Sequence, residues 1–125
     1  MEHLPAEKLE WTPAPAEHFT GQVWFGPLSS HHVDALGVLF APGARTDWHR
    51  HPEGQVLYVV SGAGRVGTEQ TVIEVGPGDV VYAPPGELHW HGAAPTSYMM
   101  HLSLTTGGPT TWEPRKVTDD EYQRG

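Results

Sequence analysis

Short segments of alternating apolar and polar residues recur along the chain, separated by glycine, proline and small polar residues. Because successive side chains of a strand point to opposite faces, this alternation is typical of half-buried β-strands. The pattern predicts strands at 22–25, 33–41, 46–51, 55–60, 65–67, 71–75, 80–82, 88–92 and 97–105. Strands this short, with turns this evenly spaced, predict an all-β sandwich or small barrel.

The two ends of the chain lack the alternating pattern of the centre. Residues 1–20 hold three prolines among acidic residues, which predicts an N-terminal arm lying on the barrel or on a neighbouring subunit. Residues 21–125 are expected to form one domain, since the whole chain has the length of a single domain. The sequence from Thr118 to Glu121 has the spacing of a capping box, so a short C-terminal helix is predicted there.

Composition narrows the classes of partner. A formal net charge of −8 with seven basic residues disfavours nucleic acid and anionic membrane surfaces, and leaves a small molecule as the expected partner. The absence of cysteine excludes disulfides and thiolate metal sites, so any metal must be held by histidine or oxygen ligands. With neither a membrane-length apolar stretch nor a signal-peptide pattern, the sequence predicts a cytoplasmic protein.

Two histidines separated by one residue stand out in the segment 43–62. In an extended strand His49 and His51 point to the same face, whereas Arg50 points to the opposite face. Such a pair supplies half of a metal site. His89, at the end of a segment rich in glycine and proline, is the candidate for the second half.

The first of these segments resembles the first conserved motif of the cupin superfamily, G(X)5HXH(X)3,4E(X)6G. Gly43, His49, His51 and Gly62 match it, and Gln55 stands where glutamate is usual.

The second segment resembles the second cupin motif, G(X)5PXG(X)2H(X)3N. Gly78, Pro84, Gly86 and His89 match it, and Ala93 stands where asparagine is usual. Together the motifs imply a cupin fold, a jelly-roll barrel also called a double-stranded β-helix. They say little about the reaction, because this barrel hosts many chemistries.

Residues 77–96 and 100–104 are similar to a subgroup of small cupins that includes carboxymuconolactone-decarboxylase-associated cupins and manganese-dependent bacterial hydroxynitrile lyases. This resemblance implies a divalent metal ion, preferably manganese, with iron, nickel, cobalt or zinc as alternatives. The implied ligands are His49, His51, Gln55 and His89. A pocket glutamine of the subgroup falls on Thr105 here, and that departure leaves the substrate open.

An amide in place of a carboxylate changes the charge of the expected site. Four neutral ligands would leave the +2 charge of the ion uncompensated, which favours Lewis-acid chemistry over oxygen activation. They would also leave coordination positions open for a substrate. The alternative for Gln55 is that it only forms a hydrogen bond inside the barrel.

Two further histidines are candidates for proton transfer. His91 follows His89 by two residues and should face the same side, and His101 could reach the same cavity from the last strand. The resemblance places both beside the substrate, and the alternative is that they serve packing or support the ligands. The expected pocket residues are Leu36, Val38, Thr46, Leu57, Met99 and Thr105.

The sequence therefore predicts a metal-dependent cupin enzyme that acts on a small oxygenated molecule by Lewis-acid and acid/base chemistry. A lyase of the hydroxynitrile-lyase type or a related carbon–carbon cleavage is the favoured reaction. An iron-dependent dioxygenase and a non-catalytic small-ligand-binding cupin remain the alternatives. A homodimer is expected, because folds of this kind commonly pair their exposed sheet edges.

Overall fold

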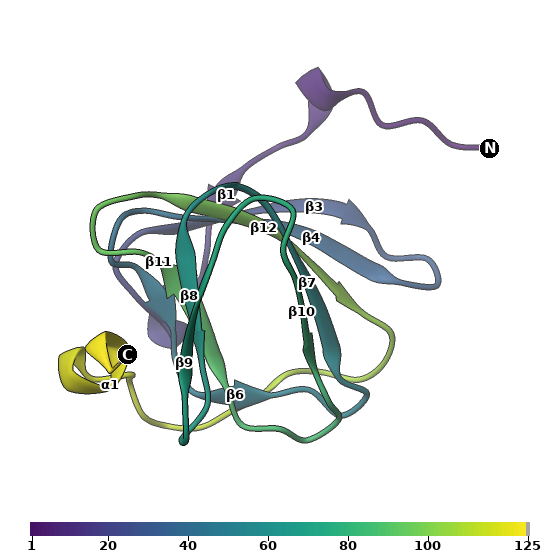
Figure 1. Ribbon diagram of the computed structural model, residues 1–125. Coiled ribbons are helices and arrows are strands. Elements are labelled where there is room, and N and C mark those ends of the chain that lie inside the picture. The colour runs from purple at the N-terminus through teal and green to yellow at the C-terminus, as the bar shows by residue number, and fades with distance from the viewer. Residues whose placement is uncertain (125) are drawn as a thin grey trace.

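Two facing antiparallel sheets form a barrel in the computed structural model, which describes residues 1–124 (Figure 1). The six-stranded sheet has the order β1 (Thr12–Pro13), β3 (Val23–Ser29), β4 (Asp34–Phe40), β12 (Met99–Thr105), β7 (Gln55–Gly62) and β10 (Val80–Ala83). The five-stranded sheet has the order β2 (Phe19–Thr20), β5 (Arg45–Thr46), β11 (Trp90–Ala93), β8 (Gly64–Gly67) and β9 (Val72–Val75). A third pair joins β13 (Thr111–Trp112) to β6 (His49–Arg50). The all-β prediction is confirmed.

The helical elements are short and lie near the termini. They are η1 (Ala6–Lys8), η2 (Ala16–His18) and α1 (Asp119–Gln123). The predicted capping box of α1 is present: the Thr118 hydroxyl accepts from the Glu121 N–H, and the Glu121 carboxylate accepts from the Thr118 N–H. Within the described residues, no helix has the length and apolar character needed to cross a membrane.

Several strand boundaries differ from those predicted. The strand expected at 46–51 is interrupted, because Trp48 turns away from the barrel interior and is buried against Val117 and Tyr122. The strand expected to end before Gly26-Pro27 runs on to Ser29. Proline is tolerated there because β1 pairs only with Trp24 and Phe25, so no described strand lies beside Pro27 on that side.

The barrel core is built from inward-facing residues of both sheets. Phe40, Leu57, Val59 and Met99 are almost completely buried there, because alternate residues of β4, β7 and β12 face the interior. A second cluster, containing Trp48 and the C-terminal residues, lies on the outer side of the five-stranded sheet.

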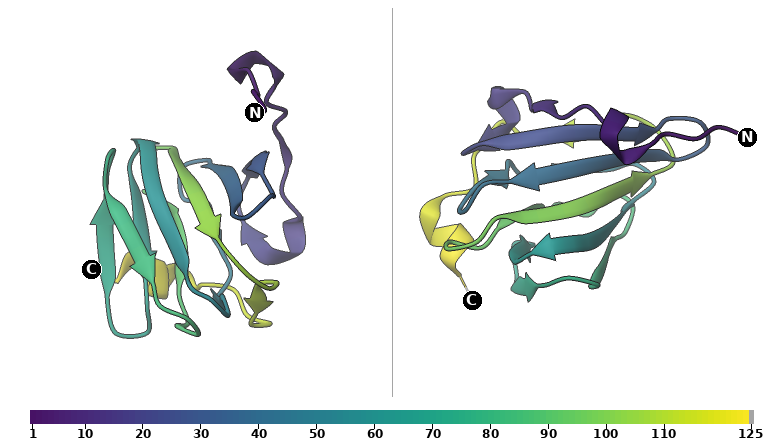
Figure 2. Two further views of the ribbon diagram at one scale, coloured as in Figure 1. Left: turned by 90° about the vertical axis from the view of Figure 1, so that its right-hand side faces the viewer. Right: turned by 90° about the horizontal axis from the view of Figure 1, so that it is seen from above.

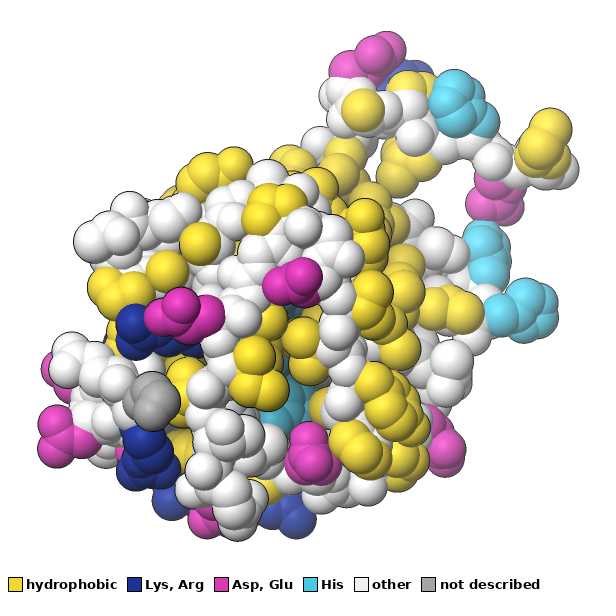
Figure 3. Space-filling view, in the orientation of Figure 1, with side chains coloured by type: hydrophobic (Ala, Val, Ile, Leu, Met, Phe, Trp, Pro, Cys, Tyr) yellow, Lys and Arg dark blue, Asp and Glu magenta, His cyan; other side chains and the backbone are white. Residues whose placement is uncertain are grey.

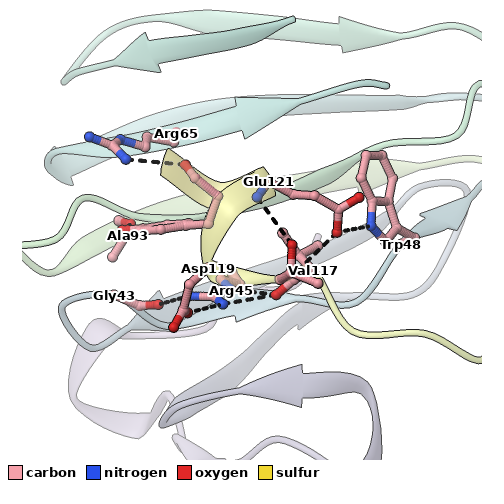
Figure 4. A network of polar contacts seen from close by, with 10 residues as sticks. Gly43, Arg45, Trp48, Arg65, Ala93, Val117, Asp119 and Glu121 are labelled. Atoms are coloured by element: carbon pink, nitrogen blue, oxygen red, sulfur yellow. Dashed lines mark hydrogen bonds and ion pairs between the residues drawn. The ribbon is translucent and has the colours of Figure 1, made fainter. Parts of the chain in front are cut away.

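The C-terminal segment is tied to this outer cluster by polar contacts (Figure 4). The buried guanidinium of Arg45 donates to the Val117 carbonyl and to the Asp119 carboxylate, both at 2.8 Å. The Trp48 indole N–H donates to Glu121 at 3.4 Å. These contacts fix β5 and the start of β6, which carries the first motif histidine.

The N-terminal segment 1–20 is only partly detached from the barrel. Its strands β1 and β2 pair with β3 and β5, whereas residues 1–10 project from the barrel (Figure 2) and return to it through Glu2, whose carboxylate lies 3.0 Å from His31 Nε2. Trp11 lies over Gly26 and Gly37, where an added Cβ would come within 2.9 Å and 2.8 Å of its indole. The two glycines therefore provide the flat surface on which Trp11 rests.

Candidate metal centre

The two cupin-motif histidines lie side by side although they are forty positions apart in the chain. His49 and His89 form an isolated antiparallel bridge in which each backbone N–H donates to the carbonyl of the other, at 3.0 and 2.9 Å. Their ring centroids are 4.4 Å apart. The ring of His51 is 5.1 Å from that of His49 and 5.5 Å from that of His89.

Local backbone carbonyls fix which ring nitrogen faces the centre. His49 Nδ1 lies 2.9 Å from the Asp47 carbonyl, and His89 Nδ1 lies 2.9 Å from the Glu87 carbonyl. A carbonyl oxygen can only accept a hydrogen bond, so both Nδ1 atoms carry the proton. Each Nε2 atom therefore keeps its lone pair, which is the form needed to bind a metal.

The side chain of Gln55, at the start of β7, completes the set. Its Nε2 donates to the Ser103 hydroxyl at 2.7 Å, and its Oε1 lies 3.0 Å from His89 Nε2. Because His89 carries its proton on Nδ1, its Nε2 is an acceptor, as is the Gln55 Oε1 atom that faces it. Two acceptors at this distance repel each other unless a cation binds both. His51 Nε2 is buried without a hydrogen-bond partner among the described residues. This donor set fits a divalent cation of the first transition series.

Burial keeps these imidazoles neutral. Removal from water lowers the pKa of His49 well below its usual value, with a further contribution from His89. The same effect lowers the pKa of His51 to about 4 and also lowers the pKa of His89. All three rings therefore present lone pairs at neutral pH.

His91 and His101 form a buried pair beside this cluster. His101 Nε2 lies 2.9 Å from His91 Nδ1, while His91 Nε2 and His101 Nδ1 have no hydrogen-bond partner among the described residues. Burial lowers the pKa of His91 well below its usual value and that of His101 to about 3. One ring nitrogen each of His49, His89 and His91 lies within 4.8 Å of the others, so His91 is as close to these two as a ligand would be.

A cavity opens beside the histidine cluster. Of the predicted pocket residues, Leu36, Val38 and Thr46 line it, together with His49, His51, Gln55 and His91. Leu57 lines a different hollow, Met99 is fully buried in the core, and Thr105 ends β12 opposite Asp34. The structure thus brings half of the predicted pocket residues to the cavity.

Five lining residues were not expected from the sequence. They are Phe19, Phe25, Ser103, Thr110 and Trp112. Ser103 shares the inward face of β12 with His101, and that alternation could have identified it. Thr110 and Trp112 come from a segment with no strand pattern, and Phe19 from the segment expected to be an arm.

Comparison with known proteins agrees with the fold and the motifs. The family model described as a cupin domain matches residues 37–105. A relative named (R)-mandelonitrile lyase, from Granulicella tundricola, is 47% identical over 118 residues, covering 88% of this chain and 89% of the relative.

Solved structures give the same result. A cupin-like protein from Thermotoga maritima superposes with a TM-score of 0.85 at 37% identity, covering 90% of each chain. The polyketide cyclase RemF from Streptomyces resistomycificus superposes with a TM-score of 0.79 over 98% of this chain and 91% of that protein. At 17% identity that likeness concerns the fold alone. The motifs, the barrel and these relatives show that the chain belongs to the cupin family.

Proposed function

We propose that this protein is a metal-dependent lyase that cleaves and forms α-hydroxynitriles. The observation that carries the proposal is the 47% identity, over most of both chains, to a relative named (R)-mandelonitrile lyase. The buried His91–His101 pair beside a three-histidine and glutamine cluster supports it, because the reaction needs a proton acceptor next to an electrophilic centre.

Four side chains would hold the cation. They are His49, His51 and His89 through Nε2, and Gln55 through Oε1. We propose manganese as the metal, and the same donor set also suits iron, cobalt, nickel and zinc. When bound, the ion supplies Lewis acidity towards the oxygen or nitrile of the substrate, undiminished by any carboxylate ligand.

The histidine pair can move the proton that the reaction requires. If His91 Nδ1 donates to His101 Nε2, then His91 Nε2 has a free lone pair and can accept the substrate hydroxyl proton. The bond between the hydroxyl-bearing carbon and the nitrile carbon then breaks. Its electron pair leaves with cyanide, the carbon–oxygen bond becomes a carbonyl, and His91 returns the proton to give hydrogen cyanide.

The cavity walls suit an apolar substituent on the substrate carbon. Phe19, Phe25, Leu36 and Val38 are among its lining residues, and the ring centroid of Trp112, which also lines it, lies 4.8 Å from that of His49. Such walls exclude water and would accept an aryl or branched alkyl group. The hydroxyl-bearing residues that line the cavity are Thr46, Ser103 and Thr110.

The test is turnover by the purified protein loaded with manganese. Benzaldehyde and hydrogen cyanide should give mandelonitrile, with one enantiomer in excess by chiral chromatography. His49→Ala should abolish this excess, and His91→Phe should lower kcat by about 100-fold or more. Absence of turnover with manganese, iron, cobalt, nickel and zinc would contradict the proposal.

An oxygen electrode separates the alternatives. Stoichiometric oxygen uptake by the iron form, with the manganese and zinc forms inert, would assign the chain to the dioxygenases instead. Saturable ligand binding that is unchanged in His91→Phe, together with no turnover, would assign it to the non-catalytic ligand-binding cupins.

A further inference from the structure

The barrel has a second hollow, on the side where its two sheets do not meet. β9 is the last strand of the five-stranded sheet and β10 the last strand of the six-stranded sheet, and no described strand bridges them. The hollow between them, called here the β9–β10 slot, is lined by residues of both edges and by His89. In Figure 3 a histidine side chain is visible at the bottom of a hollow bordered by hydrophobic side chains.

The walls of this slot belong to the inner surface of the barrel. Ile73 pairs with Val66 across β8 and β9, and it shares a face with Val75, which is buried in the core. Ile73 therefore faces inward, yet 53% of it is exposed. An inward-facing residue can be this exposed only because the barrel is open beside it.

The slot is separate from the first cavity, which is lined by Thr46, Trp112 and three of the four proposed metal ligands. The two share no lining residue. His89 lines the slot, whereas His49 and Gln55 line the cavity. A molecule in the slot would therefore approach the ligand cluster from His89, and a molecule in the cavity from the other three ligands.

The chemistry of the walls selects the ligand. Leu57, Val66, Ile73, Val81 and Ala83 make the slot mostly apolar. An ion of either sign is disfavoured, because these apolar walls offer few groups to replace the water that it would lose on entering.

We propose that the β9–β10 slot is a second binding site, which takes a small neutral molecule with an aromatic or branched aliphatic body. The molecule packs against Ile73 and Val66 and reaches the ring of His89. This proposal does not depend on the lyase reaction, since it concerns only the shape, polarity and charge of the slot.

A binding experiment with 4-fluorotoluene tests it, because this probe is neutral and has no metal-binding atom. Fluorine NMR of the zinc-loaded protein should show saturable binding. Ile73→Asp, which places a carboxylate in the slot, should weaken binding at least tenfold. Val33→Asp changes an exposed β-branched residue that does not line the slot and is the matched control; it should bind the probe as the unchanged protein does.

Other outcomes are equally decisive. Leu36→Asp places the same charge in the first cavity. If Leu36→Asp loses probe binding while Ile73→Asp retains it, the proposal is overturned. Absence of saturable binding by the unchanged protein would overturn it too. If Ile73→Asp fails to fold, Val81→Phe fills the slot without adding charge and should weaken binding similarly. Since turnover is not measured, failure here is distinct from failure of the lyase proposal.

Discussion

Ser103 accepts a hydrogen bond from the side-chain N–H of Gln55, and this contact turns the Gln55 oxygen towards His89. An amide side chain can present either its oxygen or its nitrogen, and only the oxygen can bind a metal. Ser103, which neither motif contains, therefore decides whether Gln55 can act as a ligand.

Replacing Ser103 by alanine should lower metal affinity by about 10- to 100-fold, the range found when a group supporting a ligand is lost. Ser103→Thr retains the hydroxyl and should restore most of the affinity. Competitive metal titration with a chelating dye measures both. Ser97→Ala, a surface serine outside the site, is the control. Equal affinities in Ser103→Ala and the unchanged protein would mean that Gln55 is oriented by other contacts.

Gln55→Glu should keep the metal bound but lower the proposed lyase rate. The added carboxylate neutralises part of the +2 charge, which weakens the Lewis acidity towards the substrate. We expect tighter manganese binding and a lower kcat, measured by chelator competition and by mandelonitrile formation. An undiminished kcat at full occupancy would show that the neutral ligand is not needed for the reaction.

The metal-free protein should lose stability as the pH falls below about 6.5. Burial lowers the pKa of His101 to about 3, whereas an unfolded histidine titrates near 6.5. Between these values the unfolded state binds more protons than the folded state. The free energy of unfolding is therefore highest above pH 6.5 and decreases as the pH falls towards the folded pKa. Each such histidine contributes at most about 1.4 kcal/mol per pH unit.

Urea unfolding at pH 7 and pH 5 measures this slope. His101→Gln removes one titrating group and should flatten the decline. His32→Gln, at an exposed position, is the control and should leave it unchanged. The same slope in His101→Gln as in the unchanged protein would argue against a buried neutral His101.

The predicted homodimer has a suitable surface on the outer face of the six-stranded sheet. Tyr58, Val60, Val80 and Tyr82 are exposed there, and the outward residues of β7, β10 and β12 include no charged side chain. Apolar faces of this kind mark interaction sites, and such a face can pair with its own copy across a two-fold axis.

Sedimentation velocity should therefore show a dimer that Tyr58→Glu converts to a monomer. Thr96→Glu, an exposed turn position on no strand, should leave the dimer intact. A monomeric unchanged protein at about 50 μM would contradict this expectation; stable interfaces of standard size hold together at such concentrations.

The metal-site residues could be proposed from the sequence because they depend on short-range patterns. A spacing of two residues places His49 and His51 on the same face of the chain, and it does the same for His89 and His91. The cavity walls could not be found in this way. Trp112 reaches His49 only because β13 pairs with β6, and a two-residue strand leaves no periodic pattern.

The predicted strand boundaries were wrong where contacts on the outer surface of the barrel determine the course of the backbone. Trp48 interrupts its strand because the C-terminal residues bury it on the outer surface, a contact between segments about seventy positions apart. Local propensity carries no information about such a contact. The capping box of α1 was predictable because all of its partners lie within four residues.

His49 and His89 are each oriented by a carbonyl two residues before them, so these two rings are aligned by their own segments of the chain. The residues that shape the cavity, such as Leu36, Val38 and Trp112, take no part in that alignment. Substitutions at these positions can therefore change which molecules the protein accepts while the cation stays in place. In evolutionary terms, the apolar walls are free to vary around the two motif histidines, whereas Ser103, which lines the cavity and orients Gln55, is not.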